Sequence, residues 1–359
     1  MHRKISEKSF DGQSIYVGID VHLKSWKVSV MSDQILYKTF SAPPQADKLR
    51  NYLHTNFPGA EYFSAYEAGF SGFWLHRELT KLGIKSIVVN PADIPTTDKE
   101  RKQKEDKRDS RKIARTLQAG QLKGIFIPSV RIQQDRILLR TRETIVKDLR
   151  RNKTRVKSLL YFQGINYPER FHTESSHWSK LFIQWIEGIN FDHDSGKTGL
   201  NVLLEMVKYQ RSLLLKVTRQ IRELAATTDY KQNAELLLSV PGIGILTAMK
   251  LLTELENIER FKDFDQLCSF VGLVPSTDSS GENQIDRGIT TRKNSRLMVS
   301  LIESSWVAIR SDPALLIAFQ KLCKRIPANK AIVRIAKKLL RRIVTVLRKK
   351  EKYEKGVIG

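Results

Sequence analysis

"SIYVGIDVHLKSWKVSVMSDQILYKTF", residues 14–40, is the stretch that decides the fold of the N-terminal part of the chain. Its opening "SIYVGIDV" alternates and is rich in β-branched residues, which predicts a strand. "WKVSVM" predicts a second strand, "SDQ" a turn and "ILYKTF" a third strand. The stretch therefore predicts a meander of three antiparallel strands.

Helices and strands then alternate along the chain. "QADKLRNYLHTNF" predicts a helix with Leu49 and Leu53 on one face, and "AEYFSAYEAG" predicts a strand that ends near Glu67. "GFWLHRELTKLG" predicts a short helix closed by Gly83, and "IKSIVVN" another strand. After a charged loop, a further helix is expected to begin near Asp106. The order predicts an α/β domain with a mixed sheet of the ribonuclease H kind.

Composition narrows the class of protein. The chain has 359 residues, 41% of them hydrophobic, and a formal net charge of +24. This hydrophobic content is typical of a folded protein, and the charge favours nucleic acid as partner over an anionic membrane or an acidic protein. Two cysteines, Cys268 and Cys323, are too few for a disulfide framework and are typical of reduced thiols. The polar N-terminus and the interrupted apolar runs predict no secretory signal and no membrane span, so we expect a cytoplasmic, nucleoid-associated protein.

The middle of the chain predicts two long helices with a coiled-coil seam. In residues 131–163, Leu138, Ile145, Asn152 and Leu159 fall seven apart, and a similar pattern fills residues 203–224. These helices can pair within one chain or join two chains into at least a dimer. In either case the polar seam residues Asn152 and Gln210 would set the register.

The C-terminal part predicts a mostly helical domain. "LLLSVPGIGILTAMKLLTEL" reads as two helices around a turn that holds Gly242 and Gly244. A helix-hairpin-helix element, whose turn N–H groups contact a DNA phosphate, and a plain helical hairpin explain it equally well. The tail from Arg334 to Lys355 carries ten Lys/Arg against two acids and predicts a basic amphipathic helix. We expect its Arg341 and Arg342 to contact a nucleic-acid backbone.

Two aspartates stand in the very basic segment "KEDKRDSRKIARTLQAG", residues 104–120. Asp106 and Asp109 would share one face of a helix, where they are either exposed acids paired with neighbouring bases or metal ligands. Asp20 lies inside the first predicted strand, where a carboxylate is costly to bury unless it is paired or binds a metal. In the predicted topology the first and fourth strands are neighbours, so Asp20 and Glu67 can meet beneath the helix of Asp106. His22, two residues after Asp20, would share its sheet face and could touch the site, but the interpretation that we favour is a structural role.

Four carboxylates around one space suit a pair of Mg²⁺ ions, for which Mn²⁺ could substitute, and such a pair can act on a phosphodiester. The bases beside them would guide the phosphate backbone of DNA toward the metals. These expected nucleic-acid contacts are Lys104, Lys107, Arg108, Arg111 and Lys112.

The order Asp20, Glu67, Asp106 and Asp109 resembles the DEDD motif of bacterial insertion-sequence transposases of the one-ten and eleven-eleven group. Further similar blocks follow in the family's order: "GIDVHLKSW", "YEAGFSGFWLHRELTKLG", "VNPADI", "DKRDSRKIA", "VPGIGILTAMKLLTEL" and "FVGLVPSTDSSGENQIDRGITTRKNSRL". The resemblance covers nearly the whole chain. It implies a RuvC-like catalytic domain over residues 1–128, a coiled-coil linker over 129–230 and a C-terminal transposase domain over 231–359.

The resemblance also implies a serine nucleophile, which matches Ser280 in "STDSSGEN". From the residues alone Ser276, Ser279 and Ser280 are ordinary loop serines that cannot be told apart. The resemblance selects Ser280, because Ser280 and Gly281 match the Ser-Gly pair of the family. "RGITTRKNSRL" is similar to a family stretch but departs from it at Lys293 and Ser295. The nucleic-acid contacts expected in this stretch are Arg287, Arg292 and Lys293.

The function implied is a recombinase that cuts and rejoins donor and target DNA, guided by a structured bridge RNA and acting as a dimer or, in the synaptic complex, a tetramer. Two alternatives remain at this stage. One is a metal-dependent junction endonuclease in which Ser280 is incidental, and the other is a non-catalytic nucleic-acid-binding protein that has kept the fold.

Overall fold

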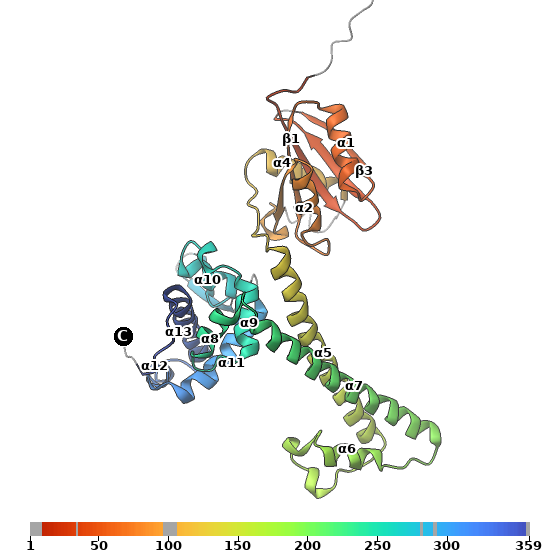
Figure 1. Ribbon diagram of the computed structural model, residues 1–359, viewed down its shortest axis with the longest axis vertical. Coiled ribbons are helices and arrows are strands. Elements are labelled where there is room, and N and C mark those ends of the chain that lie inside the picture. Colours follow the sequence, from red (N-terminus) through yellow and green to blue (C-terminus); the bar gives the residue numbers. More distant parts are fainter. Residues whose placement is uncertain (1–8, 34, 96–105, 281–282, 290–292, 357–359) are drawn as a thin grey trace, which may run out of the picture. The chain divides into compact units, whose positions relative to one another are not determined.

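The computed structural model describes residues 9–33, 35–95, 106–280, 283–289 and 293–356, with the backbone alone at 106–108, 275–280 and 283–289 (Figure 1). The chain forms two compact units, Met1–Ile127 and Pro128–Gly359. The first holds the sheet, and the second holds the long helices together with the C-terminal helices. Among the described residues, no helix joins the length and apolar character that crossing a bilayer requires.

The first unit is built on a five-stranded mixed sheet of order β3-β2-β1-β4-β5. β1, β2 and β3 are antiparallel neighbours, whereas β4 and β5 continue the sheet parallel to β1. The meander and the adjacency of the first and fourth strands are therefore confirmed. The strands are β1 Ser14–Val21, β2 Trp26–Met31, β3 Leu36–Ala42, β4 Glu61–Glu67 and β5 Lys85–Val89.

One face of this sheet is covered by α1 Ala46–Asn56 and α2 Trp74–Lys81. Leu49 and Leu53 of α1 are buried there, as their spacing predicted. From the sheet, alternate residues of β1 complete this core because side chains point to opposite faces with period two. Those β1 residues are Ile15, Val17 and Ile19. Gly83, at φ +83°, follows the end of α2, in agreement with the predicted C-cap.

The other face carries α4 Asp106–Gln118, the helix predicted to begin near Asp106. Gly18 lets this helix lie directly on β1, since a Cβ there would stand 2.1 Å from the Ser110 carbonyl oxygen and 2.4 Å from the Ala114 nitrogen. Ser110 Oγ also lies 2.9 Å from Oγ of Ser29 on β2, inside the buried interface. The position of α4 along the sheet is thus fixed by a close backbone approach and a buried hydrogen bond.

In the second unit α5 Val130–Phe162 and α7 Asp194–Ala225 lie side by side (Figure 1). The Asn152 amide nitrogen donates to Oε1 of Gln210 at 3.0 Å, so the two polar seam residues meet within one chain. Between them the chain forms α6 Lys180–Glu187. The segment "NFDHDSGKTG", residues 190–199, predicts a loop from its sequence, and this prediction is wrong from Asp194 onward, because α7 already begins there. The charge of Asp194 suits a helix N-terminus.

The C-terminal helices pack around one apolar core that also takes in Ile132 of α5 and Ile221 of α7. The basic tail is confirmed as an amphipathic helix, α13, which buries a stripe that includes Ile335 and Leu339. These helices are α8 Lys231–Leu238, α9 Ile245–Leu255, α10 Phe264–Val271, α11 Ser295–Ser311, α12 Pro313–Cys323 and α13 Ala328–Lys349. Short 3-10 turns occur at Pro91–Asp93, Glu169–Phe171, Glu174–Ser176 and Ile258–Arg260.

Two strands interrupt these helices, β6 Pro275–Ser280 and β7 Asn283–Ile289, paired as an antiparallel hairpin. The interpretation of Ser276, Ser279 and Ser280 as loop residues is therefore wrong. Serine, aspartate and asparagine are depleted in strands, so the pattern gave no strand signal. The pairing across the hairpin supplies the order that the local propensity lacks.

Candidate active site and nucleic-acid interface

Asp20 and Glu67 lie at the carboxyl ends of two neighbouring parallel strands. The register pairs Gly18 with Ala65 and Ile19 with Tyr66, so the next step along both strands brings Asp20 beside Glu67. Gly18 and Ala65 face α4, as their contacts with that helix show. Side chains alternate along a strand, so both acids lie on the α4 face as well.

The direction of α4 brings its first turn to the same edge of the sheet. Ser110 and Ala114 lie over Gly18, and Gln118 at the far end donates to the Asp33 carbonyl oxygen, at the turn between β2 and β3. The helix therefore runs opposite to β1, and it begins near the end of β1 that carries Asp20. The backbone of the first turn of α4, which carries Asp106 and Asp109, thus lies toward the edge of the sheet that holds Asp20 and Glu67, and the meeting of the four carboxylates stays a prediction.

The described acids differ in exposure. The Asp20 side chain is 22% exposed and its Oδ2 lies 3.1 Å from Nε2 of His22, so the histidine predicted to be structural contacts the first acid directly. Glu67 is exposed and Asp109 is half-buried. Among residues whose side chains are described, no group of three or more His, Cys, Asp or Glu stands ready to hold an ion, and the side chain of Asp106 is not among these residues.

The donor chemistry of this edge still fits a hard divalent cation. Two carboxylates stand at adjacent register positions, and the first turn of α4 contributes two more aspartates in sequence. Carboxylate oxygens are the ligands that Mg²⁺ prefers.

The bases of α4 are only partly described. Arg111 is exposed and its Nε donates to Oγ1 of Thr39 on β3 at 2.9 Å, while Lys112 is half-buried. Lys107 and Arg108 are placed by backbone alone, in the first turn of the helix. Lys104 lies outside the described residues.

Ser280 is the last residue of β6, and its backbone pairs with Asn283 at the head of the hairpin. Arg287 belongs to β7, where the backbone alone is described, and Arg292 lies outside the described residues. Lys293 is half-buried just before α11 and packs against Gly272, where an added Cβ would stand 2.4 Å from the lysine Cβ.

The two glycines of the predicted phosphate-binding turn have different surroundings. Gly242 has φ +79°, and a Cβ there would stand 2.1 Å from the Ser304 carbonyl oxygen of α11. This glycine is thus required for helix packing. Gly244 caps the N-terminus of α9 and faces open space, so it is the one that a phosphate can approach.

Arg341 and Arg342 both line a cavity of about 760 Å³ on α13. The Arg341 guanidinium lies 4.5 Å from the ring centroid of Phe264. Arg342 donates through Nη1 to Oδ2 of Asp312 at 2.8 Å, and the Asp312 side chain is fully buried. Arg342 therefore serves the packing of the C-terminal helices, a role that the sequence pattern did not reveal.

Two models of transposase families match the sequence of this chain. Residues 17–163 match the DEDD transposase model of the IS110 type, and residues 234–320 match the model of the transposase IS116/IS110/IS902 family. These two stretches contain the four acids and Ser280. The fold and the sequence of acids thus define a DEDD-type transposase.

Individual relatives support the same family. One relative is y4rJ of Sinorhizobium fredii (strain NBRC 101917 / NGR234), a protein named as a transposase. The chain is 30% identical to it over 76% of this chain and 74% of that protein. It is 26% identical to the transposase for insertion sequence element IS1533 of Leptospira borgpetersenii, over 72% and 76% of the two chains. With y4qE of the same Sinorhizobium strain it shares 30% identity over 68% of this chain, and the match spans 58% of that relative's length. The chain belongs to the IS110 family of insertion-sequence transposases.

Proposed function

We propose that this chain is the DNA transposase of an insertion sequence, cutting and rejoining donor and target DNA. The observation that carries the proposal is the convergence of Asp20, Glu67 and the first turn of α4 at one edge of the sheet, in a chain of this family. In this proposal the first unit is a RuvC-like catalytic domain, and the turn of Gly244 acts like a helix-hairpin-helix element on a DNA phosphate.

In this proposal Asp20, Glu67, Asp106 and Asp109 hold divalent metal, with two Mg²⁺ ions as the expected occupants and Mn²⁺ as a substitute. Metal bound there would offset the negative charge of the reacting phosphate and polarise it. The contact from His22 would orient the Asp20 carboxylate, as partners of metal ligands commonly do. The bases of α4 would hold the strand by its phosphates, which fits the net charge of +24.

Ser280 is proposed as the nucleophile. Its hydroxyl oxygen would form a bond to phosphorus while the phosphorus bond to one DNA oxygen breaks, and that oxygen would leave with the serine proton. The phosphoserine ester conserves the bond energy, so attack by another DNA hydroxyl can rejoin a strand and free the serine without ATP. A serine hydroxyl is a weak nucleophile at neutral pH, so its attack would depend on the positive charge that divalent metal held by the four acids would supply.

Recognition of sequence is proposed to rest on a structured bridge RNA that pairs with both DNA partners. Phosphate contacts hold a nucleic acid without reading its sequence, and the strongly basic composition supports binding of both RNA and DNA. We further propose that the serine and the acids act together in a homo-oligomer, a dimer or a tetramer during strand exchange. Asn152 and Gln210 contact each other within one chain, so we propose that the subunits meet through other residues.

The test is trapping of a covalent adduct. The protein is incubated with its RNA, Mg²⁺ and end-labelled DNA, and a labelled band that resists denaturation is sought. We expect the adduct in the wild type and in Ser279→Ala, and its loss in Ser280→Ala and Asp20→Asn. Free cleaved ends that persist in Ser280→Ala would establish the junction nuclease instead, and binding without cleavage under every condition would leave only a nucleic-acid-binding protein.

A further inference from the structure

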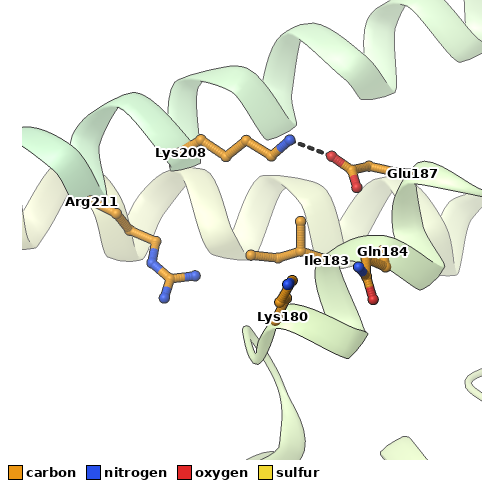
Figure 2. A pocket seen from close by; sticks show the side chains of 6 residues that line it. All are labelled: Lys180, Ile183, Gln184, Glu187, Lys208 and Arg211. Atoms are coloured by element: carbon orange, nitrogen blue, oxygen red, sulfur yellow. Dashed lines mark hydrogen bonds and ion pairs between the residues drawn. The ribbon is translucent and has the colours of Figure 1, made fainter.

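A basic pocket lies between α6 and α7, and none of its lining residues has been assigned a role above. It has a volume of about 370 Å³ and is lined by Lys180, Ile183, Gln184, Glu187, Lys208 and Arg211. Figure 2 shows Lys208 of α7 reaching Glu187 of α6, so that this ion pair bounds one side of the pocket. Lys180 and Arg211 lie on the other side of Ile183. The acid of the lining, Glu187, is thus already paired with Lys208, while Lys180 and Arg211 can face a ligand.

Outside the lining, Arg211 contacts a residue with a strained backbone, Trp178. Trp178 has φ +67°, a left-handed conformation that is unfavourable for a bulky residue. Arg211 donates through Nη1 to the Trp178 carbonyl oxygen at 2.9 Å, and the ammonium of Lys153 on α5 lies 5.2 Å from the centroid of the indole ring. Strain of this kind is commonly retained at ligand sites. Here the strained residue, Trp178, contacts two cations, Arg211 and Lys153.

The charge beside the pocket is crowded. Burial lowers the pKa of Lys153, and the positive charges of Arg211 and Lys157 lower it further. The cations of α5 and α7 therefore repel one another at this place. A bound anion would relieve that repulsion.

We propose that this pocket binds a backbone phosphate of the nucleic acid on which the transposase acts. The inference rests on the proposed function, because that function makes a phosphodiester the anion that the protein meets. Flexible lysines, a guanidinium fork and an amide around an open cavity suit a phosphate, whose oxygens accept from several donors at once. The interaction would bind without reading bases, and it would hold nucleic acid at the α6 end of the long helices.

The experiment measures binding of the full-length protein in EDTA, where strand chemistry is excluded, against salt concentration. The probes are a random-sequence duplex DNA and a stem-loop RNA in separate titrations. Lys180→Gln and Arg211→Gln should each weaken binding and reduce the salt slope by about 1 for each duplex phosphate that the variant no longer neutralises. Glu187→Gln should strengthen binding, because it removes the negative charge from the lining. Lys147→Gln on α5 and Lys216→Gln on α7, both outside the lining, serve as matched controls.

A change with one probe alone identifies DNA or RNA as the source of the phosphate and supports the site. Equal affinity of Lys180→Gln, Glu187→Gln and the controls for both probes overturns it, even if Arg211→Gln proves unstable. If the wild type binds the probes and these variants show an unchanged salt slope, the proposal for this pocket is wrong, while the proposed function stands. If the wild type binds neither probe, the proposal for this pocket and the proposed function are both wrong.

Discussion

The side-chain amide of Asn294 donates a hydrogen bond of 3.1 Å to Oε2 of Glu254, a carboxylate that is only 5% exposed. The other oxygen of Glu254 accepts from Nη2 of Arg140 on α5 at 2.9 Å. Asn294 also caps α11, since its Oδ1 accepts from the Leu297 N–H at 3.2 Å. One buried carboxylate thus ties the long helix α5 to the residue that ends the connection from β7, whose hairpin carries Ser280.

Asn294→Asp should lower the free energy of unfolding by about 1–3 kcal/mol, because it keeps the helix cap but sets a second carboxylate against the buried one. Asn294→Ser, which also keeps a capping oxygen but adds no charge, should lose less. Urea unfolding of the two variants measures the difference. An Asp variant as stable as the wild type would show that the hydrogen bond from Asn294 to Glu254 is dispensable.

Gly18→Ala should displace α4 and abolish DNA cleavage without removing any charged group. The added methyl would meet the backbone of Ser110 and Ala114, and overpacking of this kind costs about 1–3 kcal/mol. Gly69→Ala is the matched control, because a Cβ there meets nothing within 4 Å. Cleavage of labelled DNA and thermal unfolding test both variants. Full activity in Gly18→Ala would contradict the proposed dependence of the acids on the position of α4.

The glycine turn between α8 and α9 allows a separation of folding from binding. Gly242→Ala should destabilise the fold by more than about 1 kcal/mol, since φ is positive and the methyl would meet the carbonyl of Ser304. Gly244→Ala should cost less than about 1 kcal/mol of stability, because its φ is negative and the space is open and only the N-cap preference for glycine over alanine is lost. It should weaken DNA binding by crowding the N-terminus of α9. Calorimetry and a filter-binding titration would measure the two effects. Equal unfolding temperatures for the two variants would contradict this assignment.

The N-terminal sheet could be predicted because each of its elements carries a strong local signal. β1 has β-branched alternation, α1 has Leu49 and Leu53 one turn apart, and Gly83 ends α2. Once the strand order is known, the register places Asp20 next to Glu67, and side-chain alternation puts both on the same face of the sheet.

Features that depend on partners distant in sequence could not be read in this way. The hairpin of Ser280 consists of weak strand formers and is held by cross-strand pairing. The sequence around Gly18 does not indicate that α4 packs on this residue. Likewise, the sequence around Arg342 does not indicate that Asp312 is its partner. The seam of α5 and α7 fitted one chain as well as two, because a heptad pattern specifies a partner helix but not the chain that supplies it.

That seam gives a quantitative test through Asn152 and Gln210. Each single change to leucine should destabilise the protein by about 1–3 kcal/mol, because the remaining polar group loses its partner in a half-buried interface. The double leucine variant should recover much of this loss, which gives a coupling of about 0.5–3 kcal/mol in a double-mutant cycle. Strictly additive effects in urea unfolding would contradict the direct hydrogen bond.

At the C-terminal end, Asp312 lies buried beneath the tail. Its carboxylate accepts from Arg342, from the Tyr353 hydroxyl and from the Leu315 N–H at 3.1 Å. Burial alone would raise the pKa of Asp312, but the hydrogen bonds from Tyr353 and Leu315 and the charge of Arg342 together hold that pKa below its ordinary value of 3.8. Burial and the same carboxylate raise the pKa of Tyr353 to about 12.

Asp312→Asn should therefore make the stability of the protein less dependent on acid. In the wild type the unfolded state binds more protons as the pH falls below about 4, so the contribution of Asp312 is complete above that pH and is lost as the pH falls through the folded pKa. The amide keeps the cap of α12 but loses the charge, which should cost about 1–3 kcal/mol at neutral pH. Asp265→Asn is the control: this acid is 82% exposed in its pair with Lys337, so the change should be within about 1 kcal/mol at any pH. Urea unfolding at a series of pH values measures both, and an Asn variant with the acid dependence of the wild type would show that Asp312 does not set it.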